Sequence, residues 1–358
     1  MSIDEPCDQS LKQQAVVSQR DIFAIDLFSG AGGLSLGLKQ SGLRISSAVE
    51  IDRDAAQTYR LNHPEVTLIE SDIADVAPQD LITDSLQTPL AIVAGSPCQG
   101  YSAAGRRDPS CAMNSLFMEV IRIADSLEPR FVVIENVPGL RRVNGIGFSN
   151  RVCEALRDIG YLIDEPFLLR AEDFGVPQKR RRLVFMAQHH RFDAPLPPPV
   201  PTHQYSRDGL STLARTPLLE EVLADLPALD PGCTWEHGVY RGKMVYNAST
   251  MAHSQRVIDK IASIRPGEGP ISYRRLERTL ARTLVAGHRA LPVHPWLDRT
   301  ISVREAARIQ GFPDDFVFAG PRSNQPLQVA NAVPIPMARA IGLALLGASM
   351  SAQNGRES

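Results

Sequence analysis

The chain has 358 residues, of which 43% are hydrophobic and 22% charged, a composition typical of a globular protein with a full hydrophobic core. No apolar run approaches the ~20 residues of a membrane span, and the first residues lack the apolar stretch of a secretory signal, so we expect a cytoplasmic protein without a membrane anchor. The net charge of −2 argues against binding of nucleic acid through overall positive charge, and five scattered cysteines argue against a disulfide framework or a metal site.

Short apolar runs alternate with amphipathic stretches up to about residue 190. The predicted strands are Phe23–Leu27, Ile45–Val49, Leu90–Ala94, Phe131–Ile134 and Leu183–Ala187. The predicted helices are Gly33–Gln40, Asp52–Leu61, Ser115–Leu127 and Val152–Ile159. Strands that alternate with helices in this way predict an α/β fold with a doubly wound, mostly parallel sheet.

A proline-rich stretch at residues 194–201 interrupts the alternation and predicts an extended linker at a domain boundary. The next hundred or so residues are rich in Arg, Pro and Gly and have weak periodicity, which is typical of a smaller, irregular domain. Two later helices, Val303–Gln310 and Ile335–Leu346, are expected to return to the sheet. The expected division is a loose tail over 1–20, a sheet domain over 21–190, an irregular domain over 191–299, a returning segment over 300–348 and a tail over 349–358.

The glycine-rich turn DLFSGAGG at residues 26–33 lies between a predicted strand and a predicted helix. Its spacing is not that of a dinucleotide fingerprint, and no lysine accompanies the glycines as in a phosphate-binding loop, so we expect a nucleoside cofactor without a pyrophosphate. Glu50 ends the next strand, where an acidic side chain can bind ribose hydroxyls, and Asp72 could accept a bond from an adenine amino group. A helix-capping turn flanked by surface acids would explain the same residues.

Cys98 follows the predicted strand Leu90–Ala94 in the stretch GSPCQGYS. The carboxyl end of a parallel strand is where open α/β sheets bind ligands. A lone cysteine is more often a small buried hydrophobe, and that interpretation suffices for Cys7, Cys111, Cys153 and Cys233. The proline before Cys98 and the Gln-Gly after it favour an exposed turn, which makes Cys98 a candidate nucleophile. Glu135 ends the strand Phe131–Ile134 at the same edge, where it either emerges into solvent or, if protonated, could donate to a ring nitrogen.

Taken together, the motifs resemble those of DNA cytosine-5 methyltransferases of the bacterial type II restriction-modification kind. The blocks, in chain order from about Asp21 to Gly342, are DLFSGAGG, GSPCQGYS, ENVPGL, FGVPQKRRRLVF, VREAARIQGFPDDF and QVANAVPIP. Their combination in this order makes coincidence remote. The resemblance implies a Rossmann-like fold that binds S-adenosylmethionine, in which the irregular segment is a target-recognition domain.

The resemblance also implies a mechanism: methyl transfer from S-adenosylmethionine to C5 of a flipped-out cytosine in a specific duplex DNA sequence. The Cys98 thiolate would add to C6, and Glu135 would stabilise the charge that develops at N3. Arg182 would contact the base carbonyl, with Arg180 in support. Flipping the base out of the duplex costs a few kcal/mol, which pocket and backbone contacts would recover.

The resemblance implies the remaining site residues, the cofactor residues position by position and most of the DNA contacts from the segment before VREAARIQ. The expected cofactor residues are Phe28, Ala31, Gly33, Glu50, Ile51, Asp72, Ile73, Gly95, Pro97, Leu116, Asn331 and Val333. The expected DNA contacts are Gln99, Ser102, Arg274, Arg275, Arg278, Arg282, Thr283 and Leu284. Of these, the arginines at 274, 275 and 278 are expected to touch phosphate, while base or backbone contact stays open for residues 282–284. For Arg181, a place on a solvated basic strand edge is a realistic explanation, whereas the same explanation is weaker for Arg182.

Three positions depart from the family pattern: Ala330 and Arg170 replace a usual glycine and asparagine, and Ile335 follows Pro334 where a second proline is common. Two alternative functions remain, an RNA cytosine-5 methyltransferase of the tRNA type and a non-catalytic DNA-binding relative. A complete recognition segment argues against the first, and an intact Cys98 argues against the second. We expect the protein to function as a monomer and to bind duplex DNA. A cognate restriction endonuclease encoded nearby is a possible further partner, and no physical complex with it is required.

Overall fold

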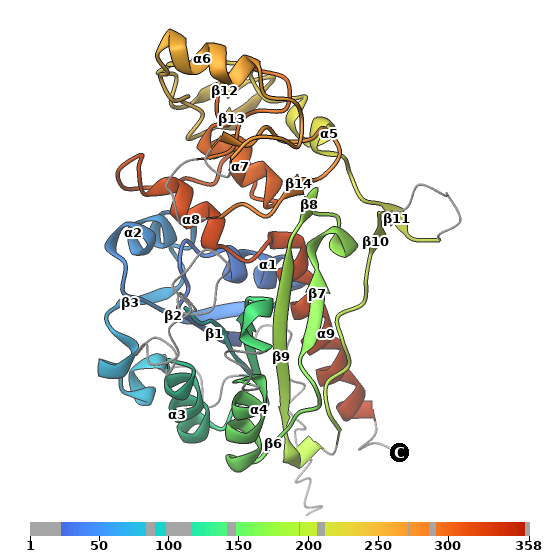
Figure 1. Cartoon of the computed structure of the whole chain (residues 1–358). Coiled ribbons are helices and arrows are strands. Elements are labelled where there is room, and N and C mark those ends of the chain that lie inside the picture. Colours follow the sequence, from blue (N-terminus) through green and yellow to red (C-terminus); the bar gives the residue numbers. More distant parts are fainter. Residues whose placement is uncertain are drawn as a thin grey trace, which may run out of the picture.

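A computed structural model describes residues 23–83, 90–97, 116–141, 148–192, 194–205, 212–270, 273–285 and 291–354. At its centre lies an eight-stranded sheet with the order β3-β2-β1-β4-β5-β9-β6, in which β7 also pairs with β9 (Figure 1). The strands are β1 (Phe23–Leu27), β2 (Arg44–Glu50), β3 (Thr67–Glu70), β4 (Ala91–Gly95), β5 (Phe131–Asn136), β6 (Tyr161–Leu162), β7 (Phe167–Arg170) and β9 (Arg181–His189).

Strands β1 to β5 are parallel, and β9 runs antiparallel to β5, β6 and β7. Every residue of β1 and of β5 is buried, as expected for strands covered on both faces, and this explains their nearly continuous apolar runs. The predicted doubly wound, mostly parallel sheet is therefore confirmed. It is also the arrangement in which several strands end at one shared edge.

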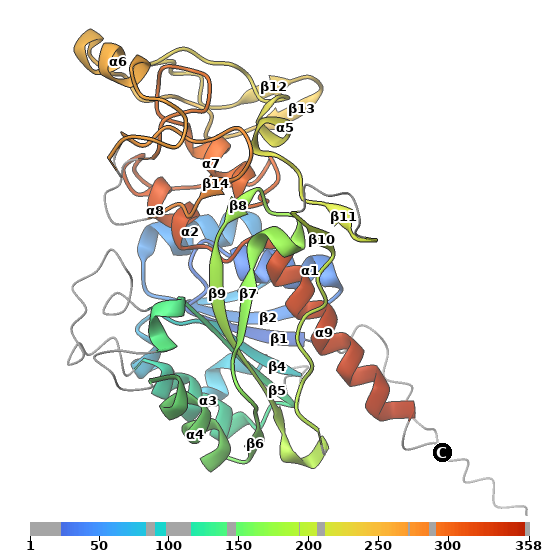
Figure 2. The same cartoon turned by 45° about the vertical axis from the view of Figure 1, so that its right-hand side comes forward.

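Helices cover both faces of the sheet (Figure 2). The helices of this part are α1 (Gly33–Ser41), α2 (Arg53–Asn62), α3 (Phe117–Leu127), α4 (Phe148–Asp158) and α9 (Ile335–Asn354). Side chains of α3 and α4 pack in one hydrophobic cluster with alternate residues of the strands, and α1 and α9 pack in a second cluster with the intervening ones. The residues from 349 to 354 extend α9, so the C-terminal tail begins later than expected.

The stretch Gln325–Met350 is long and apolar enough to cross a membrane by length and composition. However, 61% of its most apolar window is buried inside the fold. Helix α9 lies along the sheet and contacts α1, so the apolar side chains belong to the core.

A third hydrophobic cluster lies above the sheet in Figure 1, among short elements. These are α5 (Leu219–Leu223), α6 (Gln255–Ala262), α7 (Val303–Ile309), α8 (Gln325–Asn331), β8 (Gln178–Lys179), β10 (His203–Gln204), β11 (Ala214–Arg215), β12 (Gly238–Tyr240), β13 (Lys243–Val245) and β14 (Ala281–Arg282). Side chains of α7 and α8 share this cluster with α5, whereas α9 packs on the sheet. The boundary expected at residue 299 therefore does not separate two hydrophobic cores. Helices α7 and α8, which follow it, belong to the same third cluster as residues before it.

Candidate active site at the ends of β4, β5 and β9

A buried ion pair links β5 to β9. In the antiparallel register Glu135 lies opposite Val184, which places Arg182, two residues away, on the same side of the sheet. The Nε of Arg182 contacts Oε1 of Glu135, and the two residues are only 8% and 7% exposed. Removing two charges from water is costly unless they are paired, so each side chain depends on the other for its place in the interior.

The end of β4 lies beside this pair. Gly95 is the register partner of Glu135, and a Cβ at Gly95 would lie 3.9 Å from the glutamate Oε2. The buried Asn136 donates from Nδ2 to Ser96 Oγ at 3.0 Å. These contacts fix the chain up to Pro97 next to the Glu135 carboxylate. Cys98, Gln99 and Ser102 lie outside the described residues.

Arg180 is fully buried, and it contacts neighbouring segments of backbone. Its Nη1 donates to the carbonyl of Leu284 at 3.2 Å, and its Nη2 donates to the carbonyls of Ala330 at 2.7 Å and Ala332 at 3.1 Å. Ala330 and Ala332 flank Asn331. The role expected for Arg180 is therefore best described as positioning, because its guanidinium holds the C-terminal block.

Gln178 is a further site residue that the sequence motifs do not single out. Its fully buried side chain accepts a hydrogen bond from the Leu284 N–H at 3.1 Å and donates to Gln310 Oε1 at 3.3 Å. Together with Arg180, it therefore binds both backbone groups of Leu284. The only sequence signal is its place two residues before Arg180, since the buried side of a strand recurs with a period of two.

The glycine-rich turn lies at the end of β1, against the end of β2. The Glu50 carboxylate accepts the N–H of Gly30 through Oε2 and the N–H of Asp52 through Oε1, both at 2.7 Å. Burial raises the pKa of Glu50. Gly32 has φ 89°, and a Cβ there would overlap the ring of His63, so the turn requires glycine at this position.

The residues around the turn fit a nucleoside cofactor. Each Glu50 oxygen retains a lone pair for a ribose hydroxyl, and a Cβ at Gly30 would meet no atom of the described residues within 4 Å. Ile51 is 63% exposed beside Glu50, where an apolar side chain can cover an adenine face. Asp72 caps a short helix by accepting the N–H of Ala74 at 3.0 Å.

The other expected cofactor residues differ in what they expose. The Phe28 carbonyl lies 3.8 Å from the position of a Cβ on Gly95, so the turn and the end of β4 adjoin. Asn331 ends α8 and is exposed. The side chains that are buried in hydrophobic clusters, or partly buried against one, are Phe28, Ala31, Ile73, Leu116 and Val333. Gly33 is closely packed, since a Cβ there would lie 3.0 Å from the Val333 carbonyl oxygen.

Two of the expected DNA contacts do not fit the structure. Arg275 is 5% exposed, and its guanidinium donates to the carbonyls of residues 261, 264, 294 and 297 and pairs with Asp298 at 2.7 Å. It holds loops of the upper part together and is unavailable to a phosphate. The Leu284 side chain is 3% exposed and belongs to the upper hydrophobic cluster, so it cannot face DNA.

The remaining candidates are more accessible. Arg274 is half-buried and donates from Nε to the Gly269 carbonyl at 3.3 Å. Arg278 is exposed, with Glu220 at 3.8 Å. Arg282 and Thr283 are exposed on and after β14, which pairs in parallel with β8.

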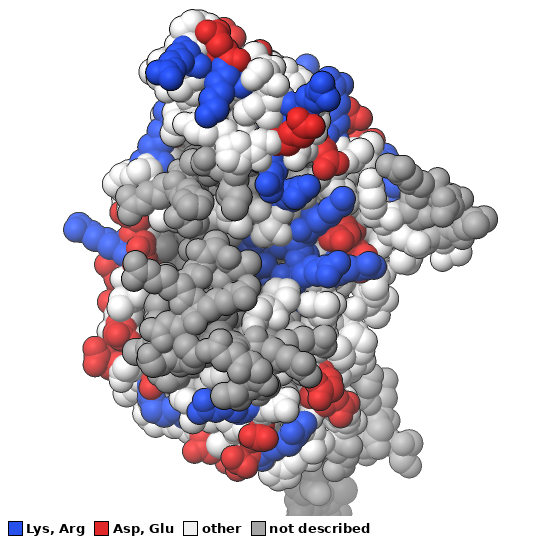
Figure 3. Space-filling view, viewed as in Figure 1, with Lys and Arg blue, Asp and Glu red and all other residues white. Residues whose placement is uncertain are grey.

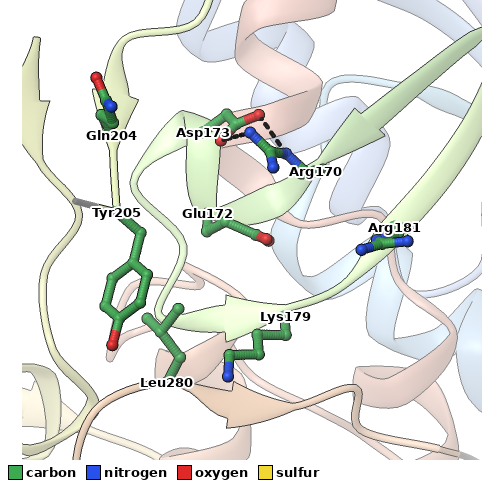
Figure 4. Close-up of a pocket in the computed structure, with 8 residues that line it drawn as sticks. All are labelled: Arg170, Glu172, Asp173, Lys179, Arg181, Gln204, Tyr205 and Leu280. Atoms are coloured by element: carbon green, nitrogen blue, oxygen red, sulfur yellow. Dashed lines mark hydrogen bonds and ion pairs between the residues drawn. The ribbon is translucent and has the colours of Figure 1, made fainter. Parts of the chain in front are cut away.

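A pocket of about 450 Å³ lies on the outer side of β8 (Figure 4). Its lining is polar, and neither Glu135 nor Arg182 takes part in it, so it is separate from the candidate active site. Arg170, one of the departures from the family pattern, binds Asp173 here through two hydrogen bonds of 2.9 and 3.1 Å. The departure thus has a local consequence, because it neutralises an acidic group in the pocket.

Comparisons with known proteins agree with this geometry. Residues 22–347 match the family model described as C-5 cytosine-specific DNA methylase. The chain is 31% identical over 370 residues to the type II methyltransferase M.DdeI of Desulfomicrobium norvegicum, covering 88% of this chain and 86% of that one. It is 32% identical over 340 residues to the type II methyltransferase M1.HphI of Haemophilus parahaemolyticus, covering 90% and 86%.

Solved structures give the same picture. A putative DNA modification methyltransferase encoded within a prophage of E. coli superposes with a TM-score of 0.76 at 26% identity, covering 92% of this chain and 99% of that chain. The Dnmt2 methyltransferase of S. pombe superposes with a TM-score of 0.61 at 15% identity, covering 91% and 98%, which shows a shared fold only.

Proposed function

The chain belongs to the C-5 cytosine-specific DNA methylase family and is a DNA cytosine-5 methyltransferase. We propose that it methylates a flipped-out cytosine in a specific duplex sequence through a covalent bond from Cys98 to C6. The observation that carries the proposal is the buried Glu135–Arg182 pair beside the chain that leads into Cys98. It supplies a carboxyl group and a guanidinium at one point of the sheet edge.

The chemistry assigns one task to each side chain. Addition of the Cys98 thiolate to C6 forms a C–S bond and shifts the electrons of the C5–C6 double bond toward C5 and N3. Glu135 stabilises the developing charge by hydrogen bonding or proton donation at N3, and Arg182 binds the carbonyl oxygen at C2. C5 then takes the methyl group, a base removes the C5 proton, and the C–S bond breaks.

S-adenosylmethionine supplies the electrophilic methyl group of this reaction. Glu50 would bind the ribose hydroxyls, Asp72 would accept from the adenine amino group, and the exposed Ile51 would cover the ring. Phe28, Gly95 and Pro97 lie where the methionine part must reach the cytosine. Asn331 would close the site from the C-terminal block that Arg180 holds.

The type II names of the relatives place them in restriction-modification systems. By analogy, we propose that this protein works as a cytoplasmic monomer on duplex DNA and protects sites that a cognate endonuclease would cut. No physical complex with that endonuclease is needed, because each enzyme acts on the DNA alone. The proposed recognition domain comprises residues 191–299 together with α7 and α8, which share its core.

The test is a covalent trap. Duplex DNA amplified with 5-fluorocytosine in place of cytosine contains every candidate site, and fluorine cannot leave C5 as a proton does. The wild-type protein should form a complex with this DNA that survives denaturation and requires S-adenosylmethionine, whereas Cys98→Ser should form none. A protein that methylates ordinary DNA without ever forming an adduct would contradict attack at C6. A protein that methylates tRNA and leaves duplex DNA unmodified would contradict the substrate.

A further inference from the structure

The strand segment that carries Arg180 and Arg182 has a second, basic side. Along residues 178–182 the side chains alternate: Gln178, Arg180 and Arg182 are buried, whereas Lys179 and Arg181 are exposed. The buried members serve the candidate active site and its supports. The exposed members have no role in the reaction described above.

Lys179 lies directly opposite Arg282 in the parallel pair β8–β14. Like charges at directly opposed positions of a sheet are destabilising. Among the residues that the structure describes, neither side chain has an acidic partner within 4.0 Å. The Thr283 hydroxyl donates to the Lys179 carbonyl at 2.8 Å and fixes the two strands in this register. Two cations are thus held side by side, and within the described part of the chain neither forms an ion pair.

The surroundings favour an anion at this point. Lys and Arg side chains gather across the middle of the face shown in Figure 3, between the sheet and the upper part. In the adjoining pocket, Asp173 is already paired with Arg170, and burial raises the pKa of Glu172 (Figure 4). Lys179 and Leu280 lie together at one side of that pocket.

We propose that Lys179 and Arg282 jointly bind one phosphodiester of the DNA backbone, and that Arg282 consequently does not read a base. The inference rests on the proposed function, since it takes duplex DNA as the substrate. The oxygens of one phosphate can accept from both cations at once, whereas base recognition by arginine uses both ends of a single guanidinium on one guanine. An arginine bound to a phosphate together with a lysine positions the duplex and carries no sequence information.

The experiment compares Lys179→Gln, Arg282→Gln and the double variant with Arg191→Gln as the control. Glutamine keeps most of the side-chain length, and the β8–β14 pairing and the Thr283 bond use backbone atoms of Lys179. Arg191 follows the far end of β9 and makes an exposed ion pair with Glu128. Bisulfite sequencing first identifies the sequence that the protein methylates. Dissociation constants are then measured between 50 and 300 mM salt for a duplex that contains this sequence and for a duplex in which it is scrambled.

Each single variant should weaken binding to both duplexes by the same factor, about three- to tenfold, and lower the salt slope, and the double variant should lower it by about 0.9, the contribution of one phosphate. The double variant should lose less than the sum of the two, because both cations bind one phosphate. Relaxed preference at one base pair with an unchanged slope for Arg282→Gln, or a Lys179→Gln variant that binds like the control, would overturn the inference. Wild-type formation of 5-methylcytosine in the same duplex shows separately whether the proposed function holds.

Discussion

The Arg182 guanidinium contacts the Glu135 carboxylate across the antiparallel pair β5–β9, and both groups are buried. The contact joins the block that contains Glu135 to the basic block that contains Arg182. In the free protein each charge neutralises the other. In the proposed reaction Arg182 would donate to the carbonyl oxygen at C2, and Glu135, as a protonated carboxyl group, would donate to N3, which lies next to C2 on the ring.

Replacing Glu135 with glutamine keeps the shape of the side chain but leaves the buried Arg182 charge without its partner. We expect kcat for DNA methylation to fall about 10²–10⁴-fold. The free energy of unfolding should fall by about 3 kcal/mol, the usual cost of breaking a buried pair. Steady-state kinetics and urea denaturation measure the two effects. The matched control is Glu172→Gln in the outer pocket, and equal turnover of the two variants would contradict the role of Glu135.

Replacing Gln178 with alanine removes the acceptor for the buried Leu284 N–H. An unsatisfied buried N–H costs about 1–3 kcal/mol, so the segment that contains Arg282 and Thr283 should shift. We expect KM for DNA to rise about tenfold while the Kd for S-adenosylmethionine stays unchanged, because the cofactor turn lies elsewhere. A uniform loss of both affinities would mean that Gln178 only stabilises the fold.

Arg275→Ala should affect stability, whereas Arg278→Ala should affect DNA binding. The first removes a guanidinium that binds carbonyl groups and Asp298, and it should lower the free energy of unfolding by about 3 kcal/mol or more. The second removes an exposed charge and should change stability by less than about 0.5 kcal/mol while weakening DNA binding in a salt-dependent way. Thermal unfolding and DNA titration separate the two. A stable Arg275→Ala protein with weakened DNA binding would restore Arg275 as a phosphate contact.

Asp26, in the strand that leads into the cofactor turn, predicts a pH dependence. Burial raises the pKa of Asp26 from its ordinary 3.8 to about 7, although Ser35 donates to the carboxylate at 2.6 Å. The folded state therefore binds this proton more tightly than the unfolded state, and stability falls as pH rises from about 4 to about 7. Asp26→Asn should be more stable than wild type at pH 8, by up to about 4 kcal/mol, and similar to it near pH 4. Equal unfolding free energies at pH 8 would contradict the prediction.

Much of the fold could be predicted because the parallel strands are covered on both faces. The predicted strand Phe23–Leu27 has the same bounds as β1, and the predicted helices over the sheet differ from the observed ones mainly at their ends. The sheet strands that the pattern does not reveal are β3, β6 and β7. All three are short, and β3 and β7 are also half-exposed, so their apolar periodicity is weak. Glu135 could be placed because an acid after an apolar strand must lie at the sheet edge.

The DNA-facing residues were harder to predict. Arg275 and Arg278 are both arginines in an irregular segment, and only the fold shows that one binds backbone carbonyls while the other is exposed. Leu284 directly follows Thr283 in the sequence, yet its side chain lies in the core. Gln178 has a role only because β14, about a hundred residues later in the sequence, pairs with its strand. Such contacts depend on chain segments that are distant in sequence.

The most direct test of the account is mass spectrometry of nucleosides from unmethylated bacterial or phage DNA incubated with the protein and S-adenosylmethionine. Wild type should produce 5-methyldeoxycytidine, and Cys98→Ser should produce none while it still folds and binds DNA. A methyl group on another atom, such as N4 of cytosine or N6 of adenine, would contradict the account, as would 5-methyldeoxycytidine formed at a near-normal rate by Cys98→Ser.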